Sequence, residues 1–104
     1  MKYFYIFVRQ DIPLEQQIIQ SNHATQQMME KFPDKSRDII PFTVLIGIPN
    51  EVWLDSVVKH LKNLNIDHVA FLDTDFDFGV VAVVTVPLED EQRKALRHYP
   101  LYKS

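Results

Sequence analysis

Three aspartates at alternate positions, Asp73, Asp75 and Asp77, form one group of side chains that could carry chemistry. Carboxylates gathered this closely can hold a hard cation. A calcium loop that began at Asp73 would need glycine at its sixth position and glutamate at its twelfth, where Phe78 and Val84 stand. We therefore favour an acidic hairpin turn, for which aspartate is a preferred residue. A weak magnesium site in a metal-assisted hydrolase is the rarer alternative.

A second group of polar side chains is the run Gln20-Ser21-Asn22-His23. These four residues fall within about one turn of a segment with helical periodicity. His23 could act there as a neutral hydrogen-bond partner or as a general base. The alternative interpretation is the polar face of an amphipathic helix. Sequence spacing does not decide between them, because catalytic triads assemble in space.

Composition removes several other kinds of site. The chain has no cysteine, which excludes disulfides, thiolate metal sites and a cysteine nucleophile. Its two glycines are too few and too far apart for a phosphate-binding loop. None of the histidines is three or four positions from another, the spacing of a helical metal site; they are His23, His60, His68 and His98. We expect neither a metal nor a cofactor.

Length and charge describe a single ordinary domain. The chain has 104 residues, of which 46% are hydrophobic, and we expect one domain over residues 1–104. The net charge of −3 argues against a protein whose whole surface binds nucleic acid. We interpret the basic residues as solvated helix faces, with a local basic patch as the alternative; they include Lys31, Lys35, Arg37, Lys59, Lys62, Arg93, Lys94, Arg97 and Lys103.

The location expected from the sequence is the cytoplasm. No apolar stretch approaches the roughly 20 residues that a membrane span needs, and we expect no membrane association. The apolar run at residues 3–8 meets Arg9 and Asp11 without the small residues of a signal-peptide cleavage site. The absence of cysteine is compatible with a reducing compartment.

A strand and a helix must position the polar group at residues 20–23. The continuous aromatic and β-branched run at residues 3–8 predicts a buried strand. Asp11 is the expected N-cap of a helix that has Pro13 in its first turn and ends near Phe32, before Pro33. Apolar residues at helical spacing should form its packed face; they include Leu14, Ile18, Met28, Met29 and Phe32.

The remaining elements position the aspartate cluster. Each is bounded by proline, asparagine or aspartate, which favour caps and turns. In order, the sequence predicts a loop at residues 34–41, a strand at 43–48, a helix from about 51 to 64 with Trp53 in its apolar stripe, a strand at 69–72, a turn at 73–79, a strand at 80–86 and a short helix from 89 to 98.

The predicted fold class is α/β, with the element order β-α-β-α-β-β-α. Strands separated by helices are expected to pair in parallel through right-handed crossovers. The short connection between the last two strands favours an antiparallel hairpin instead. The result is a four-stranded mixed sheet with helices on both faces, and the last strand should be central because it is apolar almost throughout.

Three segments together resemble the type 2 peptidyl-tRNA hydrolase family. Residues 8–12, Val-Arg-Gln-Asp-Ile, resemble the family's V-R-x-D-L at the end of the first strand. Residues 20–24, Gln-Ser-Asn-His-Ala, resemble its Q-C-x-H-A on the first helix. Asp73, followed by residues 79–87 with their terminal Pro87, resembles the family's aspartate turn and the strand after it. The element order of this fold agrees as well.

The resemblance implies an activity, a partner and a site. Members of the family cleave the ester bond between a peptide and the ribose of tRNA. The resemblance therefore implies tRNA or peptidyl-tRNA as a partner, with catalytic roles for Asp11, Gln20, His23 and Asp73. A homodimer is an assembly that the sequence leaves open.

The sequence departs from the family at three places, and this favours a different hypothesis. The family's Gly-Lys pair before the helix is absent, and Glu15 stands nearby. A lysine there would neutralise phosphate or a developing oxyanion, whereas a glutamate does the opposite. The family's turn glycine and threonine are replaced by Asp75 and Asp77, and its strand threonine by Ala82. The alternative to the hydrolase is thus a non-catalytic binding module that kept the fold.

Overall fold

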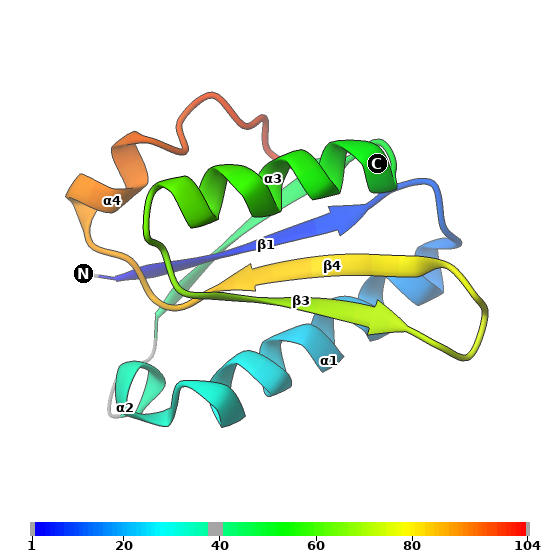
Figure 1. Ribbon diagram of the computed structural model, residues 1–104, viewed down its shortest axis with the longest axis horizontal. Coiled ribbons are helices and arrows are strands. Elements are labelled where there is room, and N and C mark those ends of the chain that lie inside the picture. Colours follow the sequence, from blue (N-terminus) through cyan, green and yellow to red (C-terminus); the bar gives the residue numbers. More distant parts are fainter. Residues whose placement is uncertain (1, 38–40, 104) are drawn as a thin grey trace.

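The computed structural model describes residues 2–37 and 41–103. Its helices and strands follow the predicted order, with one short helix added after the first (Figure 1). They are β1 (Tyr3–Arg9), α1 (Leu14–Lys31), α2 (Pro33–Ser36), β2 (Phe42–Ile48), α3 (Glu51–Asn63), β3 (His68–Asp73), β4 (Gly79–Thr85) and α4 (Asp90–Lys94).

The described strands form one four-stranded mixed sheet in the order β2-β1-β4-β3. Strand β1 pairs with β2 in parallel and with β4 antiparallel, and β3 pairs with β4 antiparallel. The mixed sheet and the β3–β4 hairpin are therefore confirmed, and β1 and β4 are central. The expectation that all strands separated by helices pair in parallel was wrong for β3. Because β4 occupies the second side of β1, β3 does not pair with β1 and instead pairs with its hairpin partner, at the edge opposite β2.

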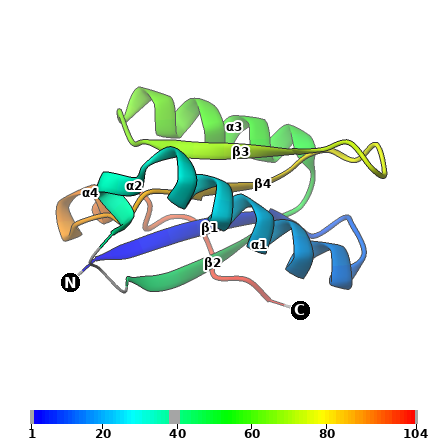
Figure 2. The same ribbon diagram turned by 90° about the horizontal axis from the view of Figure 1, so that it is seen from below.

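Helices cover both faces of the sheet, as predicted. Figure 1 shows α1 on one side of the strands and α3 on the other, and Figure 2 shows the same layers from below. Helix α1 packs on β4, β3 and β1, and α3 packs on β4, β1 and β2. This double cover explains why β1 and β4 are apolar almost throughout, since both of their faces are buried.

The face of α1 that packs on the sheet differs from the predicted one. It buries Gln17 and Gln20, together with Ala24 and Met28. Leu14 and Ile18, expected in the packed face, are instead 59% and 65% exposed. The cause is the position of the helix: although it connects β1 to β2, it lies over β4 and β3 and makes few contacts toward β2. The face of β2 on this side of the sheet is left uncovered.

The ends of α1 also differ from the prediction. Asp11 does not cap it: the helix begins at Leu14 with Pro13 at the N-cap and no side-chain capping bond. At the other end, Pro33 does stop α1, but it then occupies the first turn of α2 within the predicted loop. Proline suits that position because the missing N–H has no intrahelical acceptor there. Residues 38–40 of the predicted loop lie outside the described residues.

The last part of the chain returns across the sheet. Helix α3 begins where expected, with the Asn50 side chain accepting from the backbone N–H of Trp53 at 3.1 Å, but Trp53 itself is exposed rather than packed. Helix α4 is shorter than expected. The tail that follows reaches the outer edge of β2, where Leu101 bridges to Ile46 and the Tyr102 N–H donates to Leu45 O at 2.9 Å.

Candidate functional site

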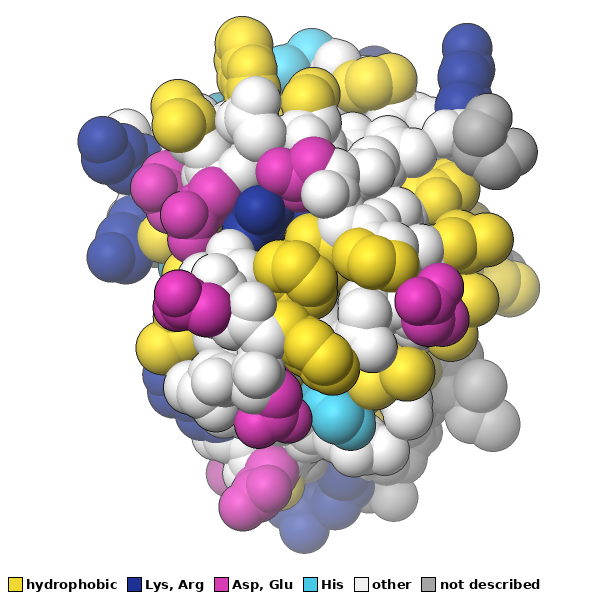
Figure 3. All heavy atoms as spheres, turned by 90° about the vertical axis from the view of Figure 1, so that its right-hand side faces the viewer, with side chains coloured by type: hydrophobic (Ala, Val, Ile, Leu, Met, Phe, Trp, Pro, Cys, Tyr) yellow, Lys and Arg dark blue, Asp and Glu magenta, His cyan; other side chains and the backbone are white. Residues whose placement is uncertain are grey.

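The residues of the candidate site meet at one end of the sheet. Strands β1 and β3 both finish there, and β4 begins there after the turn. Asp73 is the last residue of β3, Asp11 follows β1 by two positions, and Gln20 and His23 lie on α1. Figure 3 looks onto this end: hydrophobic and acidic side chains dominate the middle of the face, histidine lies among them, and most Lys and Arg side chains lie toward the margins.

The carboxylate of Asp73 is buried and turned into its own loop. Asp73 as a whole is only 5% exposed. Oδ2 accepts from the backbone N–H groups of Phe76 and Phe78, at 3.0 and 3.2 Å. Oδ1 accepts from the backbone N–H of Asp75 at 3.3 Å. Aspartate commonly accepts from backbone groups a few residues ahead, which stabilises turns.

Gln20 completes the set of donors around Asp73. Its Nε2 donates to Asp73 Oδ1 at 3.5 Å and to Gln16 Oε1 at 3.1 Å. The Oε1 atom of Gln20 is buried and has no partner among the described residues. Exchanging the amide oxygen and nitrogen would bring two acceptors together at Asp73, so the orientation shown is the better one. The four donors use the full hydrogen-bonding capacity of the Asp73 carboxylate.

Arg9, rather than a catalytic group, is the partner of Asp11. The guanidinium of Arg9 forms a two-point pair with Asp11, with Nε–Oδ1 at 2.9 Å and Nη2–Oδ2 at 3.0 Å. Its Nη1 donates to the backbone oxygens of Phe78 and Val80. The hydrogen bonds that Arg9 donates to Asp11 raise the pKa of Arg9 above its usual value, against an opposing effect of burial. Arg9 thus ties the end of β1 to the β3–β4 turn.

The backbone of Phe78 joins these two groups into one chain of hydrogen bonds. Its N–H donates to Asp73 and its carbonyl accepts from Arg9. Gln20 is therefore linked through Asp73, Phe78 and Arg9 to Asp11. Three of the four residues implied by the family resemblance lie in one hydrogen-bonded network, although they come from three different elements.

His23 lies outside this network. It is exposed on α1, and its ring and that of Phe71 on β3 meet in a T-shaped arrangement, with ring centroids 5.7 Å apart. Among the described residues it has no hydrogen-bond partner, so no carboxylate orients the imidazole. A histidine that serves as a general base is usually oriented by a second group.

The charge at this end of the sheet is predominantly acidic. Asp75 and Asp77 are exposed beside the buried Asp73, and Glu51 accepts from the backbone N–H of Val80 at 2.8 Å. Glu15 lies in the first turn of α1. In the described parts of the chain, no three His, Cys, Asp or Glu side chains are arranged to hold a metal ion.

Sequence reasoning missed the two residues that organise the site, Arg9 and Glu51. Arg9 was noticed only as part of a motif and as the end of an apolar run. A charged residue that directly continues a buried strand is itself a signal, because burial of an arginine requires partners. Glu51 gave no such signal, since a glutamate in the first turn of a helix is ordinary.

Comparison with known proteins bears on the fold alone. No family model matches the chain, and no curated protein matches it in sequence. A solved structure of a protein of unknown function from Agrobacterium tumefaciens superposes with a TM-score of 0.72 and 11% identity, covering 98% of each chain. The chain is therefore an α/β protein whose four-stranded mixed sheet and helices have a counterpart in a solved structure. No described helix is both long and apolar enough to cross a membrane.

Proposed function

We propose that this chain is a divergent relative of the type 2 peptidyl-tRNA hydrolases that serves as a non-catalytic binding module. Support for the relationship comes from the element order and from the places of the three resembling segments. These segments lie at the end of β1, within α1, and from the end of β3 to the end of β4. The same elements bring Gln20 to Asp73 across 53 positions of sequence.

The main observation that supports a non-catalytic role is the hydrogen bonding of the Asp73 carboxylate. A general base needs a free lone pair within reach of the water or hydroxyl that it deprotonates. Both oxygens of Asp73 accept from donors of its own turn and from Gln20. The carboxylate therefore acts as a structural group that holds the turn.

Two further features weigh in the same direction. A tRNA substrate would approach a face that carries Asp75, Asp77 and Glu15, and these charges repel phosphate. The segment from Asp11 to α1 supplies no lysine to stabilise a developing oxyanion. Arg9 does not take that role, because its guanidinium is committed to Asp11 and two carbonyls.

A second candidate function is hydrolysis of peptidyl-tRNA or a smaller ester. The observation in its favour is the meeting of Gln20 with Asp73, two residues that the family resemblance assigns to the active site. In this case Gln20 would position a water and His23 would accept its proton. The buried, unpartnered Oε1 of Gln20 would then be an acceptor that a rearranged site could use.

Hydrolysis of N-blocked aminoacyl-tRNA separates the two candidates. We expect the purified protein to release no amino acid above the uncatalysed rate, while an active type 2 enzyme in a parallel reaction does. The informative variant is His23→Ala, because His23 is exposed and its loss should leave the fold intact. Turnover that disappears in His23→Ala would overturn the binding-module proposal and establish the hydrolase.

A further inference from the structure

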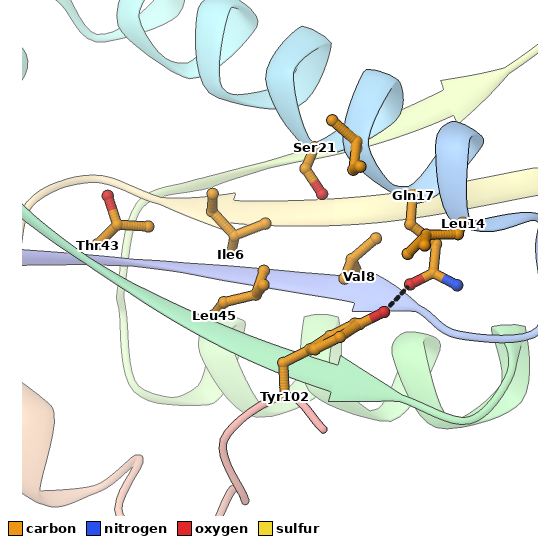
Figure 4. A pocket seen from close by; sticks show the side chains of 9 residues that line it. Ile6, Val8, Leu14, Gln17, Ser21, Thr43, Leu45 and Tyr102 are labelled. Carbon is orange, nitrogen blue, oxygen red and sulfur yellow. Dashed lines mark hydrogen bonds between the residues drawn. The ribbon is translucent and has the colours of Figure 1, made fainter. Parts of the chain in front are cut away.

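A cavity of about 310 Å³ lies between α1 and β2. Its floor is the α1-facing side of β1, and one end is closed by the ring of Tyr102 (Figure 4). The side chains that line it are Ile6, Val8, Leu14, Gln17, Ile18, Ser21, Thr43, Leu45 and Tyr102. Small-molecule sites in proteins have volumes of about 300 to 1,000 Å³, so this cavity is large enough to hold a ligand.

The position of α1 creates the cavity. The helix lies mainly over β4 and β3, so the α1-facing side of β2 is left largely uncovered. This is also why Leu14, Ile18 and Leu45 remain 59%, 65% and 37% exposed. Exposed aliphatic side chains that surround a concavity are unfavourable in water unless something covers them.

The chemistry of the lining selects an uncharged ligand. No charged side chain lines the cavity. A carboxylate, phosphate or ammonium group buried there would lose hydration without gaining an oppositely charged partner. The aliphatic side chains of Ile6, Val8 and Leu45 supply instead a surface for a hydrocarbon or aromatic body.

Two hydroxyls supply the polar part of the site. Among the described residues, neither Ser21 Oγ nor Thr43 Oγ1 has a hydrogen-bond partner, and they come from opposite walls, α1 and β2. Figure 4 shows the Ser21 hydroxyl directed into the cavity. Gln17 is not available in the same way. Its Nε2 donates to Ile12 O at 2.9 Å, and its Oε1 accepts from Tyr102 Oη at 2.6 Å.

We infer that this cavity binds a neutral, mainly apolar small molecule that carries one hydroxyl or carbonyl group. The apolar body would lie on Ile6, Val8 and Leu45, and the polar group would hydrogen-bond with Ser21 or Thr43. A sealed apolar cavity of about 150 Å³ accommodates benzene, so twice that volume suits a two-ring aromatic or a comparable aliphatic chain. The site lies on the β2 side of α1, whereas Gln20 and Asp73 meet on its β3 side. It is therefore independent of the proposed loss of catalysis.

Tyr102 serves as the end wall of the site. Its backbone N–H donates to Leu45 O at 2.9 Å, and its hydroxyl donates to Gln17 at 2.6 Å. Gln10 Nε2 donates to Lys103 O at 2.7 Å and holds the next residue. These contacts fix the ring across one end of the cavity, so the ligand would enter over Leu14 and Ile18.

The test is a titration of the ¹⁵N-labelled protein with β-naphthol, a neutral two-ring alcohol, followed by amide chemical shifts. We expect a Kd below about 1 mM for a ligand of this size. The largest shifts should fall in the first two turns of α1 and in β2 around Leu45. β-Naphthoate, which has the same rings with a carboxylate, should bind at least tenfold more weakly.

Matched variants establish the location. Leu45→Lys places a charge in the cavity and should abolish binding, whereas Val52→Lys makes a similar change at a residue that is 74% exposed on α3 and should leave binding unchanged. Replacing both Ser21 with alanine and Thr43 with valine should weaken binding about three- to tenfold, as expected for one lost hydrogen bond. Ile18→Lys, at an exposed rim position, repeats the Leu45 test without risk to the core.

Three results would overturn the inference. One is the absence of saturable shifts with β-naphthol. Another is binding that survives both Leu45→Lys and Ile18→Lys. The third is a set of shifts centred on Trp53, which would place the ligand in the groove on the opposite face of the sheet, between α3 and the tail.

Discussion

Replacement of Asp73 by asparagine tests directly whether its carboxylate holds the β3–β4 turn. The two residues have nearly the same shape, but asparagine offers one acceptor oxygen in place of two. Whichever way the amide is oriented, its NH₂ group faces donors. These are either Phe76 and Phe78 N–H at Oδ2, or Asp75 N–H and the Gln20 amide at Oδ1.

The expected cost follows from the number of hydrogen bonds lost. A hydrogen bond to a charged group contributes about 1.5–3 kcal/mol, and two of the four are lost in either orientation. Because these bonds are long and partly exposed, we take the lower figure for each, which gives about 3 kcal/mol for Asp73→Asn. In a domain of this length, that corresponds to a fall in Tm of about 12–24 °C.

Thermal unfolding followed by circular dichroism measures this difference. The matched control is Asp75→Asn, the same chemical change in the same turn at an exposed side chain. It should alter the free energy of unfolding by less than about 0.5 kcal/mol. If Asp73→Asn unfolded at the same temperature as Asp75→Asn, the carboxylate would not be engaged by its turn, and our reason for excluding it from catalysis would be refuted.

Three further changes test other parts of the structure. Arg9→Met should lower the free energy of unfolding by about 3 kcal/mol in urea denaturation, because two backbone carbonyls and Asp11 lose their donor. The control Arg37→Met, at an exposed ion pair, should cost less than about 0.5 kcal/mol. Equal losses in the two variants would contradict the structural role given to Arg9. Burial raises the pKa of Tyr99 above its ordinary value of 10.0. The neutral phenol therefore stabilises the fold fully below pH 10, and this stabilisation is lost as the pH rises through the folded pKa. Urea midpoints plotted against pH should fall less steeply above pH 10 in Tyr99→Phe than in the parent, and equal slopes for the two proteins would argue against this. Asp77 has a φ of 58°, in the left-handed region that a β-branched residue avoids and glycine adopts freely. Asp77→Val should therefore cost about 1–2 kcal/mol, while Asp77→Gly should change the free energy of unfolding little. Similar shifts in Tm for the two variants would be inconsistent with a left-handed conformation at Asp77.

The sheet could be predicted from sequence because its strands carry strong local signals. The run at residues 3–8 is continuously apolar and the run at 80–86 is apolar except for Thr85, which is typical of strands buried on both faces. The short acidic link between β3 and β4 favours a hairpin, and the structure has one. These features depend on neighbouring residues, so a single sequence contains the information needed to predict them.

The rotation of α1 could not be predicted in the same way. Its apolar residues at Leu14 and Ile18 indicate one packed face, while the sheet covers Gln17 and Gln20 instead. Which face is buried depends on where the helix sits relative to β4, a strand that lies far along the chain. Tertiary position overrode the hydrophobic pattern, as it commonly overrides local preference.

Only part of the hydrogen-bonded network at the candidate site could be anticipated from the sequence. Gln20 and Asp73 do meet, but which donors occupy the two Asp73 oxygens depends on how the turn folds. Asp11 was expected to cap α1, and the nearby Arg9 competes for it because a buried guanidinium requires a counter-charge. The roles of individual polar residues depend on such competition between partners.

The central pairing of β1 with β4 has a consequence for how the protein is made. The Tyr5 N–H donates to the Thr85 hydroxyl across 80 positions of sequence. Ribosomes add about 5–20 residues per second, so the first strand must wait about 4–16 s for its partner to be synthesised. During that interval the apolar segment Tyr3–Arg9 has no antiparallel neighbour, and unpaired apolar strands are prone to aggregate.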